Sequence, residues 1–253
     1  MASRKPLIAG NWKMFGRNTD LAEIGVLAET IGPAVDKIDV LVCPPAVLIA
    51  PAAWQMRGKS LLVGGQDCSP SAADAARTGE VSAAMLADVG AKYVIVGHSE
   101  RRQNHQETDD LVRQKAEAAL LAGLVPIVCV GETHAERAAG RVAEIVSRQV
   151  KASTPAQGGG TFAVAYEPVW AIGGNSTPTL SEIGDVHSLI RETLTQQFGG
   201  QANETRILYG GSVGPKNAGE IFTVEGVDGA LVGRASLKAS DFAAIILGHP
   251  AAV

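Results

Sequence analysis

The stretch RILYGGSVGPKNAG, residues 206 to 219, shows a pattern of strand, turn and helix that recurs along the chain. A short apolar run is followed by a glycine-rich turn and then by a segment that reads as a helix. Residues 210 to 214 also satisfy the G-x-S-x-G pattern of a hydrolase nucleophile turn. The stretch therefore leaves two readings of Ser212: a reactive hydroxyl, or a turn that is used for its backbone amides.

Seven other apolar runs resemble the one that begins at residue 206 in length, in bounding glycine or proline residues and in β-branched content. Runs of this kind predict strands that are buried on both faces of a sheet. The eight expected strands lie in PLIAGN at 6 to 11, DVLVCPP at 39 to 45, SLLVGGQD at 60 to 67, YVIVGHSE at 93 to 100, VPIVCVGE at 125 to 132, FAVAYEP at 162 to 168, RILYGGS at 206 to 212 and GALVGRAS at 229 to 236.

Longer segments with helical periodicity lie between these runs. In TDLAEIGVLAETIG, residues 19 to 32, the apolar residues fall on one face and Gly32 supplies a stop. The segment from 108 to 123 has the same pattern and an acidic first turn. Further helices are expected at 181 to 198, at 215 to 222 and from 236 onward, including 240 to 247.

Alternating strands and helices, with connections long enough for parallel crossovers, predict an α/β fold: a single closed (β/α)8 barrel, one domain spanning residues 1–253. A doubly wound open sheet is the alternative. Its usual G-x-G-x-x-G fingerprint is absent, because the first run ends in Asn11, Trp12 and Lys13.

Composition and charge narrow the class of partner. The chain has 253 residues, 46% of them hydrophobic, and a net charge of -4, which offers no basic stripe for nucleic acid. Three widely spaced cysteines, Cys43, Cys68 and Cys129, indicate neither a disulfide framework nor a zinc site, so a reducing cytoplasm is expected. No apolar run approaches the length of a membrane span, and no membrane partner is expected.

The strands of a parallel barrel point their carboxyl ends at one face, so the residues that follow each run should converge there. Most candidates at this mouth are polar residues or glycines. They are Asn11, Lys13, His98, Ser99, Glu100, Cys129, Glu132, Glu167, Gly210, Gly211, Ser212, Gly233 and Arg234.

Two of these residues have the chemistry of an acid–base pair. Glu167 emerges at a strand end before a stiff proline, and the apolar and glycine residues that follow it resemble a lid. Burial under such a lid would raise the pKa of Glu167 toward that of a useful base. His98 precedes a helix start, whose amides would disfavour the charged imidazolium.

The glycine turns after the last two runs predict a phosphate site, which barrels often build from these loops. Glycine lets backbone amides approach an anion closely, so Ser212 is expected to contribute chiefly its amide. The hydrolase alternative needs Asp228 or Asp241 and His249 as partners of Ser212. His249 lies near the C-terminus, where fraying is expected.

Six blocks of this chain stand in the order and at the spacing of the triosephosphate isomerase family: AGNWKM, VIVGHSERR, CVGE, AYEPVWAIG, YGGSV and DGALVG. The resemblance covers essentially the whole chain. It implies Glu167 as the catalytic base, His98 as the electrophile, and Glu100 as a supporting carboxylate. It also implies that Lys13 and Asn11 bind the substrate oxygens, and that the phosphate is held by amides at Gly173, Ser212, Gly233 and Arg234.

The resemblance further implies an enzyme of glycolysis and gluconeogenesis that interconverts dihydroxyacetone phosphate and glyceraldehyde 3-phosphate, with no metal or organic cofactor. A homodimer is implied by GGQDCSPSAADAARTGE, which matches the family's interdigitating loop. Three alternatives stay open: an isomerase of a four-carbon ketose phosphate, a serine hydrolase, and a silent phosphate-binding barrel.

The chain departs from the family pattern at four positions. Pro178 lacks an N–H that other members can offer to the tyrosine matching Tyr209. Arg234 replaces a glycine and adds positive charge near the expected phosphate site. Phe15 stands where asparagine is common, and Arg77 stands where an aromatic residue is usual.

Overall fold

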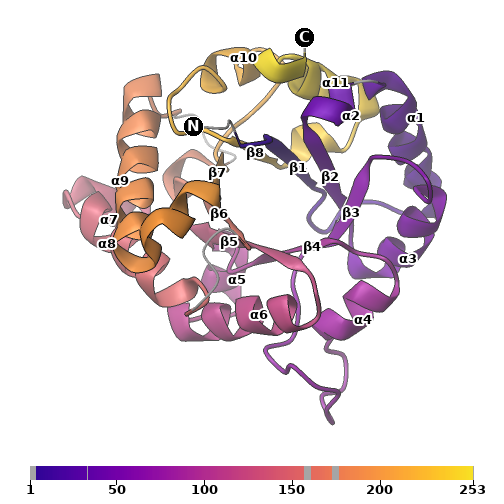
Figure 1. Cartoon of the computed structure of the whole chain (residues 1–253), viewed down its shortest axis with the longest axis horizontal. Helices are drawn as coiled ribbons and strands as arrows, with labels where there is room; N and C mark the ends of the chain where they lie inside the picture. The colour runs from indigo at the N-terminus through magenta and orange to yellow at the C-terminus, as the bar shows by residue number, and fades with distance from the viewer. Residues whose placement is uncertain (1–3, 33, 157–160, 173–176, 253) are drawn as a thin grey trace.

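The computed structural model describes residues 4–32, 34–156, 161–172 and 177–252. Eight parallel strands form a closed barrel in sequence order, and helices surround it (Figure 1). Within the described residues, no helix is long and apolar enough to cross a membrane. The strands are β1 Leu7–Asn11, β2 Asp39–Cys43, β3 Leu62–Gly65, β4 Tyr93–Val96, β5 Val125–Val130, β6 Ala163–Tyr166, β7 Arg206–Tyr209 and β8 Gly229–Val232.

The barrel closes because β1 pairs with both of its spatial neighbours. Leu7 aligns with Asp39 on β2 and with Gly229 on β8. The helices of the outer layer are α1 Leu21–Ile31, α2 Ala34–Lys37, α3 Ala46–Gln55, α4 Ala83–Asp88, α5 Ser99–Asn104, α6 Asp109–Leu121, α7 His134–Ala138, α8 Val142–Ser153, α9 Leu180–Phe198, α10 Ala218–Ile221 and α11 Ala239–Leu247.

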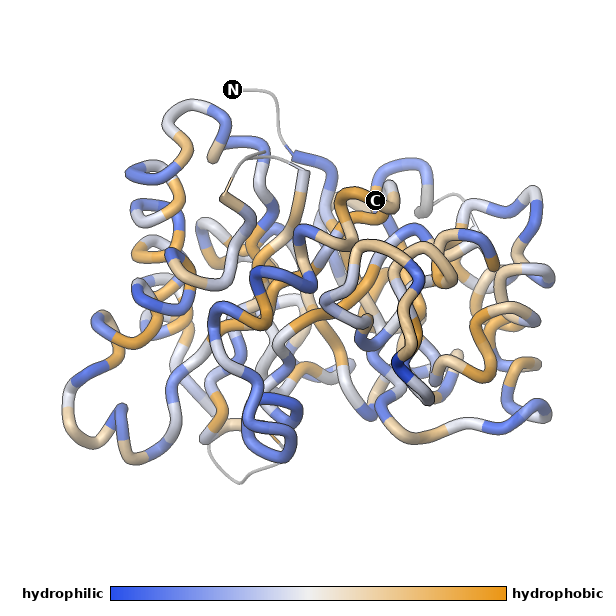
Figure 2. Tube along the Cα trace, turned by 90° about the horizontal axis from the view of Figure 1, so that it is seen from below, coloured by the Kyte–Doolittle hydropathy of each residue, from blue (hydrophilic) through white to orange (hydrophobic). Residues whose placement is uncertain are grey.

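Alternation along each strand divides the core into two layers. On β5, Ile127 and Cys129 point into the barrel, whereas Val128 and Val130 pack outward against the helices. Both layers are buried, which explains why the strands read as continuous apolar runs in the sequence. Hydrophobic residues accordingly concentrate inside, and hydrophilic ones on the outer surfaces and loops (Figure 2).

The structure confirms the predicted barrel and all eight predicted strands. The helix expected at 215 to 222 is shorter than predicted and covers only Ala218–Ile221. Asn217 explains the difference, because its side chain donates to Ser212 O at 3.0 Å and accepts from Gly214 N at 2.8 Å, which closes a turn. The structure after β8 likewise begins as a 3-10 turn, Arg234–Ser236, before α11.

Candidate active site

The mouth of the barrel brings Glu167 and His98 together from two different strands. Glu167 directly follows β6, where its backbone N–H donates to Val130 O on β5 at 2.7 Å. A side chain at Gly131 would lie 1.7 Å from Glu167 O, so only glycine permits this close approach of the two strand ends. His98 follows β4 and caps the start of α5.

His98 and Glu167 form a buried contact across the mouth. The distance from His98 Nε2 to Glu167 Oε1 is 2.9 Å, and only 5% of His98 and 2% of Glu167 are exposed. The other carboxylate oxygen accepts from Ser99 N at 3.0 Å. His98 Nδ1 accepts from Glu100 N at 3.2 Å, which leaves the ring proton on Nε2, facing Glu167.

The contact sets the pKa of both groups. Burial disfavours the charged imidazolium, but the facing Glu167 carboxylate raises the pKa of His98 above its ordinary value. Burial likewise disfavours the carboxylate, but His98, the Ser99 amide and Lys13 lower the pKa of Glu167. Both directions are opposite to those expected from the sequence, because the two groups face each other directly.

Lys13 follows Asn11 and has a left-handed backbone, with a φ of 54°. This conformation is uncommon for a residue with a side chain, and such strain is found most often at functional sites. The Lys13 ammonium contacts Glu100 Oε1 at 2.6 Å. Lys13 therefore enters the mouth from β1 and contacts the Glu100 carboxylate in the first turn of α5.

The sequence analysis missed Gln66, which holds the strained backbone of Lys13. The Gln66 amide donates to Lys13 O at 2.8 Å and to Cys43 O at 2.9 Å, and so ties the ends of three strands together. Asn11 Oδ1 accepts from Lys13 N at 2.9 Å and holds the other side of the same residue. Gln66 directly follows β3, so the strand-end rule extended to the third run would have found it.

The glycine turns after β7 and β8 lie at the same mouth as Lys13. A side chain at Gly233 would lie 3.5 Å from Lys13 Cε. Arg234 follows with a side chain exposed at the surface. Its φ is not positive, so this position does not need the freedom of the glycine that is usual in the family. Gly173 falls outside the described residues.

The hydrogen bonds and ion pairs of the described residues do not join Ser212 to Asp228 or His249, although Asp241 lines the same surface pocket as Ser212. The Ser212 hydroxyl donates to Ala171 O at 2.6 Å. Asp228 is paired with Arg4 and Arg191 by contacts of 2.8 and 3.0 Å. His249 Nδ1 accepts from Ala251 N at 3.0 Å. The described contacts therefore assemble no nucleophile, base and acid around Ser212.

Two other features of the mouth bear on the chemistry. Burial raises the pKa of the Cys129 thiol, and the Glu167 carboxylate adds to the rise, so this cysteine packs beside the site as a neutral group. Among the described residues, no group of three or more His, Cys, Asp or Glu side chains is placed to hold a metal ion.

Tyr209, at the end of β7, has a buried hydroxyl without a hydrogen-bond partner among the described residues. A side chain at Gly211 would lie 2.2 Å from this hydroxyl. The ring thus folds back over the turn that follows its own strand. Pro178, which has no N–H to donate to this hydroxyl, is buried.

A closed parallel barrel with a buried contact between a carboxylate and an imidazole, and an ammonium group beside it at the mouth, is typical of a (β/α)8 barrel enzyme. The model of the triosephosphate isomerase family matches residues 6–248. A triosephosphate isomerase of Afipia carboxidovorans is 54% identical over 247 residues, which are 97% of this chain and 98% of that protein.

Two further comparisons agree. A triosephosphate isomerase of Xanthobacter autotrophicus is 53% identical and covers 99% of both chains. The crystal structure of triosephosphate isomerase from Bartonella henselae superposes with a TM-score of 0.90 at 41% identity, covering 96% of this chain and 98% of that one. The chain belongs to the triosephosphate isomerase family.

The contact between His98 and Glu167 predicts a change in titration when the carboxylate is removed. We expect Glu167→Gln to lower the pKa of His98 below the wild-type value, because burial then acts with less opposition. Titration of the His98 ring by NMR measures the effect. Glu100→Gln is the matched control and should lower the pKa less, since Glu100 Oε2 lies 3.6 Å from Nδ1 and its side chain is 48% exposed. An unchanged or higher pKa in Glu167→Gln would contradict this account.

Proposed function

We propose that the chain interconverts dihydroxyacetone phosphate and D-glyceraldehyde 3-phosphate, with Glu167 as the base and His98 as the electrophile. The enzyme is an intramolecular isomerase, as are its named relatives. The observation that carries the residue roles is the 2.9 Å contact between Glu167 and His98 at the mouth of the barrel. A base and an N–H donor are thereby brought within reach of one small substrate.

The proton moves between two adjacent carbons of the substrate. The Glu167 carboxylate removes a proton from the carbon beside the carbonyl, and the electrons of that C–H bond form the enediolate. His98 Nε2–H donates to the oxygen that gains charge, and Lys13 stabilises the same charge. Glu167 then returns the proton to the neighbouring carbon. In the same step His98 Nε2 passes its proton to the charged oxygen and takes the hydroxyl proton of the adjacent oxygen, which becomes the new carbonyl. The substrate oxygen takes the place at His98 Nε2 that Glu167 Oε1 occupies in the structure.

The remaining site residues bind the substrate. Asn11 is 5% exposed at the end of β1, and its amide supports the backbone of Lys13. Glu100 holds the Lys13 ammonium until the substrate arrives. We assign the phosphate to the backbone amides after β7 and β8, at Ser212, Gly233 and Arg234. Gly173, outside the described residues, completes this set by resemblance.

We also propose that residues 1–253 form one barrel domain and that the protein works in the cytoplasm. The described residues run through all eight strands of one closed barrel. All three cysteines are free and buried, which suits a reducing compartment. The pathway assignment, glycolysis and gluconeogenesis, follows from the activity.

A homodimer is the assembly that this surface supports. The loop between β3 and α4 projects beyond the ring of helices (Figure 1), and its residues 72–80 are exposed. Beside the barrel mouth lies a cavity of about 840 Å³ that is lined by Met14, Gln66, His98 and Glu100, among others. Met14 is 94% exposed, and a partner chain packed against this surface would bury its apolar side chain.

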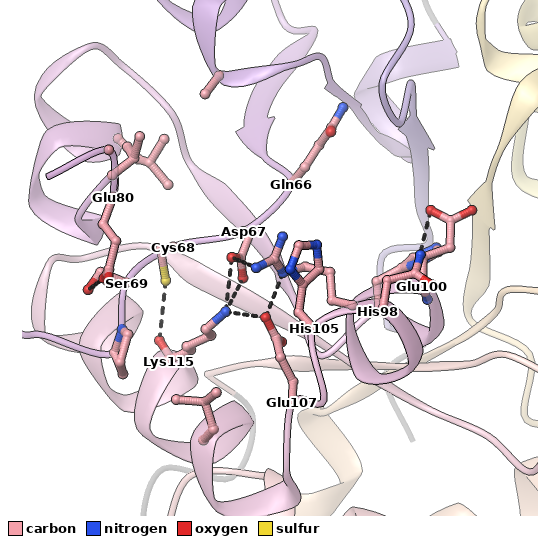
Figure 3. A pocket seen from close by; sticks show the side chains of 18 of the residues that line it. Gln66, Asp67, Cys68, Ser69, Glu80, His98, Glu100, His105, Glu107 and Lys115 are labelled. Atoms are coloured by element: carbon pink, nitrogen blue, oxygen red, sulfur yellow. Dashed lines mark hydrogen bonds and ion pairs between the residues drawn. The ribbon is translucent and has the colours of Figure 1, made fainter. Parts of the chain in front are cut away.

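The floor of this cavity carries a network of ion pairs (Figure 3). Lys115 Nζ lies 2.7 Å from Asp67 Oδ1 and 2.6 Å from Glu107 Oε1. Arg101 bridges the same two carboxylates at 2.9 and 2.6 Å. A preformed concave surface of this kind suits the small residues at the tip of the loop, SAADAA at 71 to 76, from a second copy.

The proposed roles predict the result of a coupled isomerase assay. We expect Glu167→Gln to lower kcat by about 10²- to 10⁴-fold, because the amide cannot accept a proton from carbon. Glu144→Gln on the exposed face of α8 is the control and should stay within about 2-fold of wild type. Wild-type preference for a four-carbon ketose phosphate in the same assay would overturn the substrate assignment. Full activity in Glu167→Gln would overturn the role of this residue.

The proposed dimer predicts a solution mass of about twice the 26.1 kDa of one chain, measured by light scattering. Ala75→Arg places a long charged side chain at the loop tip and should shift the mass toward one chain. Ala244→Arg, on α11 at the opposite side of the ring (Figure 1), makes the same change and should leave the dimer intact. A wild-type mass of one chain at micromolar concentration would refute the dimer.

A further inference from the structure

Arg234 and Phe15, two departures from the family pattern, contact each other between the loops that follow the neighbouring strands β8 and β1. The guanidinium carbon of Arg234 lies 5.8 Å from the centroid of the Phe15 ring. This distance is within the range of a cation–π contact, with the charge above the ring face. The sequence alone gave no reason for Phe15, and the structure supplies one.

The contact belongs to a larger interface between the loops that follow β1 and β8. Trp12 Nε1 donates to Ser236 O at 3.1 Å, and Trp12 is 2% exposed. Lys13 Cε lies 3.5 Å from the position of a side chain at Gly233. The pairing of Arg234 with Phe15 is the outer contact of this interface. Phe15 thereby holds the guanidinium at the β1 side of the loop to which we assign the phosphate.

The charge of Arg234 is not compensated by a carboxylate among the described residues. The neighbouring cations differ in this respect. Lys13 contacts Glu100 at 2.6 Å, and Lys238 contacts Glu23 at 2.8 Å. Since the whole chain carries a net charge of -4, an approaching phosphate dianion meets an unfavourable overall field. A free cation at the mouth counteracts this field locally.

We propose that the Arg234 side chain, held in place by Phe15, is a second cation of the phosphate subsite and increases the affinity for phosphate dianions. The proposal rests on the function proposed above and deepens it. Arg234 acts here through its side chain, in addition to the backbone amide that the resemblance implies. Phe15 is a positioning residue, because it contacts the guanidinium and not the substrate.

The test compares Arg234→Gln with Arg57→Gln, a matched control. Arg57 also stacks on an aromatic ring, 4.2 Å from the centroid of Trp54, but lies before β3 at the other end of the barrel. We expect Arg234→Gln to raise KM and the inhibition constant of inorganic phosphate about 3- to 10-fold, with kcat within about 2-fold. The fall of kcat/KM with added salt should be shallower than in wild type. Arg57→Gln should change none of these values.

The role of Phe15 is tested by combining substitutions. Phe15→Leu should raise KM in the wild-type background and should have no further effect in Arg234→Gln. An equal effect in both backgrounds would refute the pairing. Unchanged KM, inhibition and salt dependence in Arg234→Gln would refute the second cation.

Titration of the wild type and Arg234→Gln with inorganic phosphate by calorimetry separates this proposal from the function itself. If the wild type fails to convert triose phosphates, the proposed function fails. Weaker binding of phosphate by the variant would still support the role of Arg234, and equal binding would still refute it.

Discussion

The structure of the site depends on the single hydrogen bond that His98 Nε2 can donate. That bond goes to Glu167 Oε1 at 2.9 Å, with both groups buried. A buried carboxylate without such a partner would be costly. In the proposed reaction the same N–H is the donor at the substrate oxygen. The contact that stabilises the Glu167 carboxylate is therefore the one that the substrate would replace.

The fold holds the Glu167 carboxylate and the His98 ring in place through hydrogen bonds from several strand ends. Glu167 is tied to β5 through Val130, and the helix amides of Ser99 and Glu100 orient the carboxylate and the ring from the other side. Gln66 and Asn11 hold the strained backbone of Lys13. These supports come from the ends of four strands, β1, β3, β4 and β5, which is why a closed parallel barrel suits the task.

The fold was predictable from the sequence because parallel strands buried on both faces read as apolar runs, and eight such runs alternate with helical segments. The strand-end rule likewise located Glu167, His98 and Lys13. Their direct contacts were not predictable, since they depend on side-chain conformations that no spacing encodes. The pairing of Phe15 with Arg234 joins residues at opposite ends of the chain, and only the closure of β1 on β8 brings them together. The G-x-S-x-G pattern alone is ambiguous for a physical reason: a nucleophile turn and a phosphate turn both need glycine between a strand and a helix.

The central claim is that Glu167 carries a proton between two carbons while His98 holds the oxygen. The most direct measurement is the conversion of dihydroxyacetone phosphate in D2O, with NMR detection of deuterium at the carbon beside the carbonyl. Proton transfer through a carboxylate that exchanges with solvent predicts deuterium in the recovered substrate and product of the wild type, and none above background with Glu167→Gln. Conversion by the wild type without any incorporation from solvent, or undiminished incorporation with Glu167→Gln, would contradict the account.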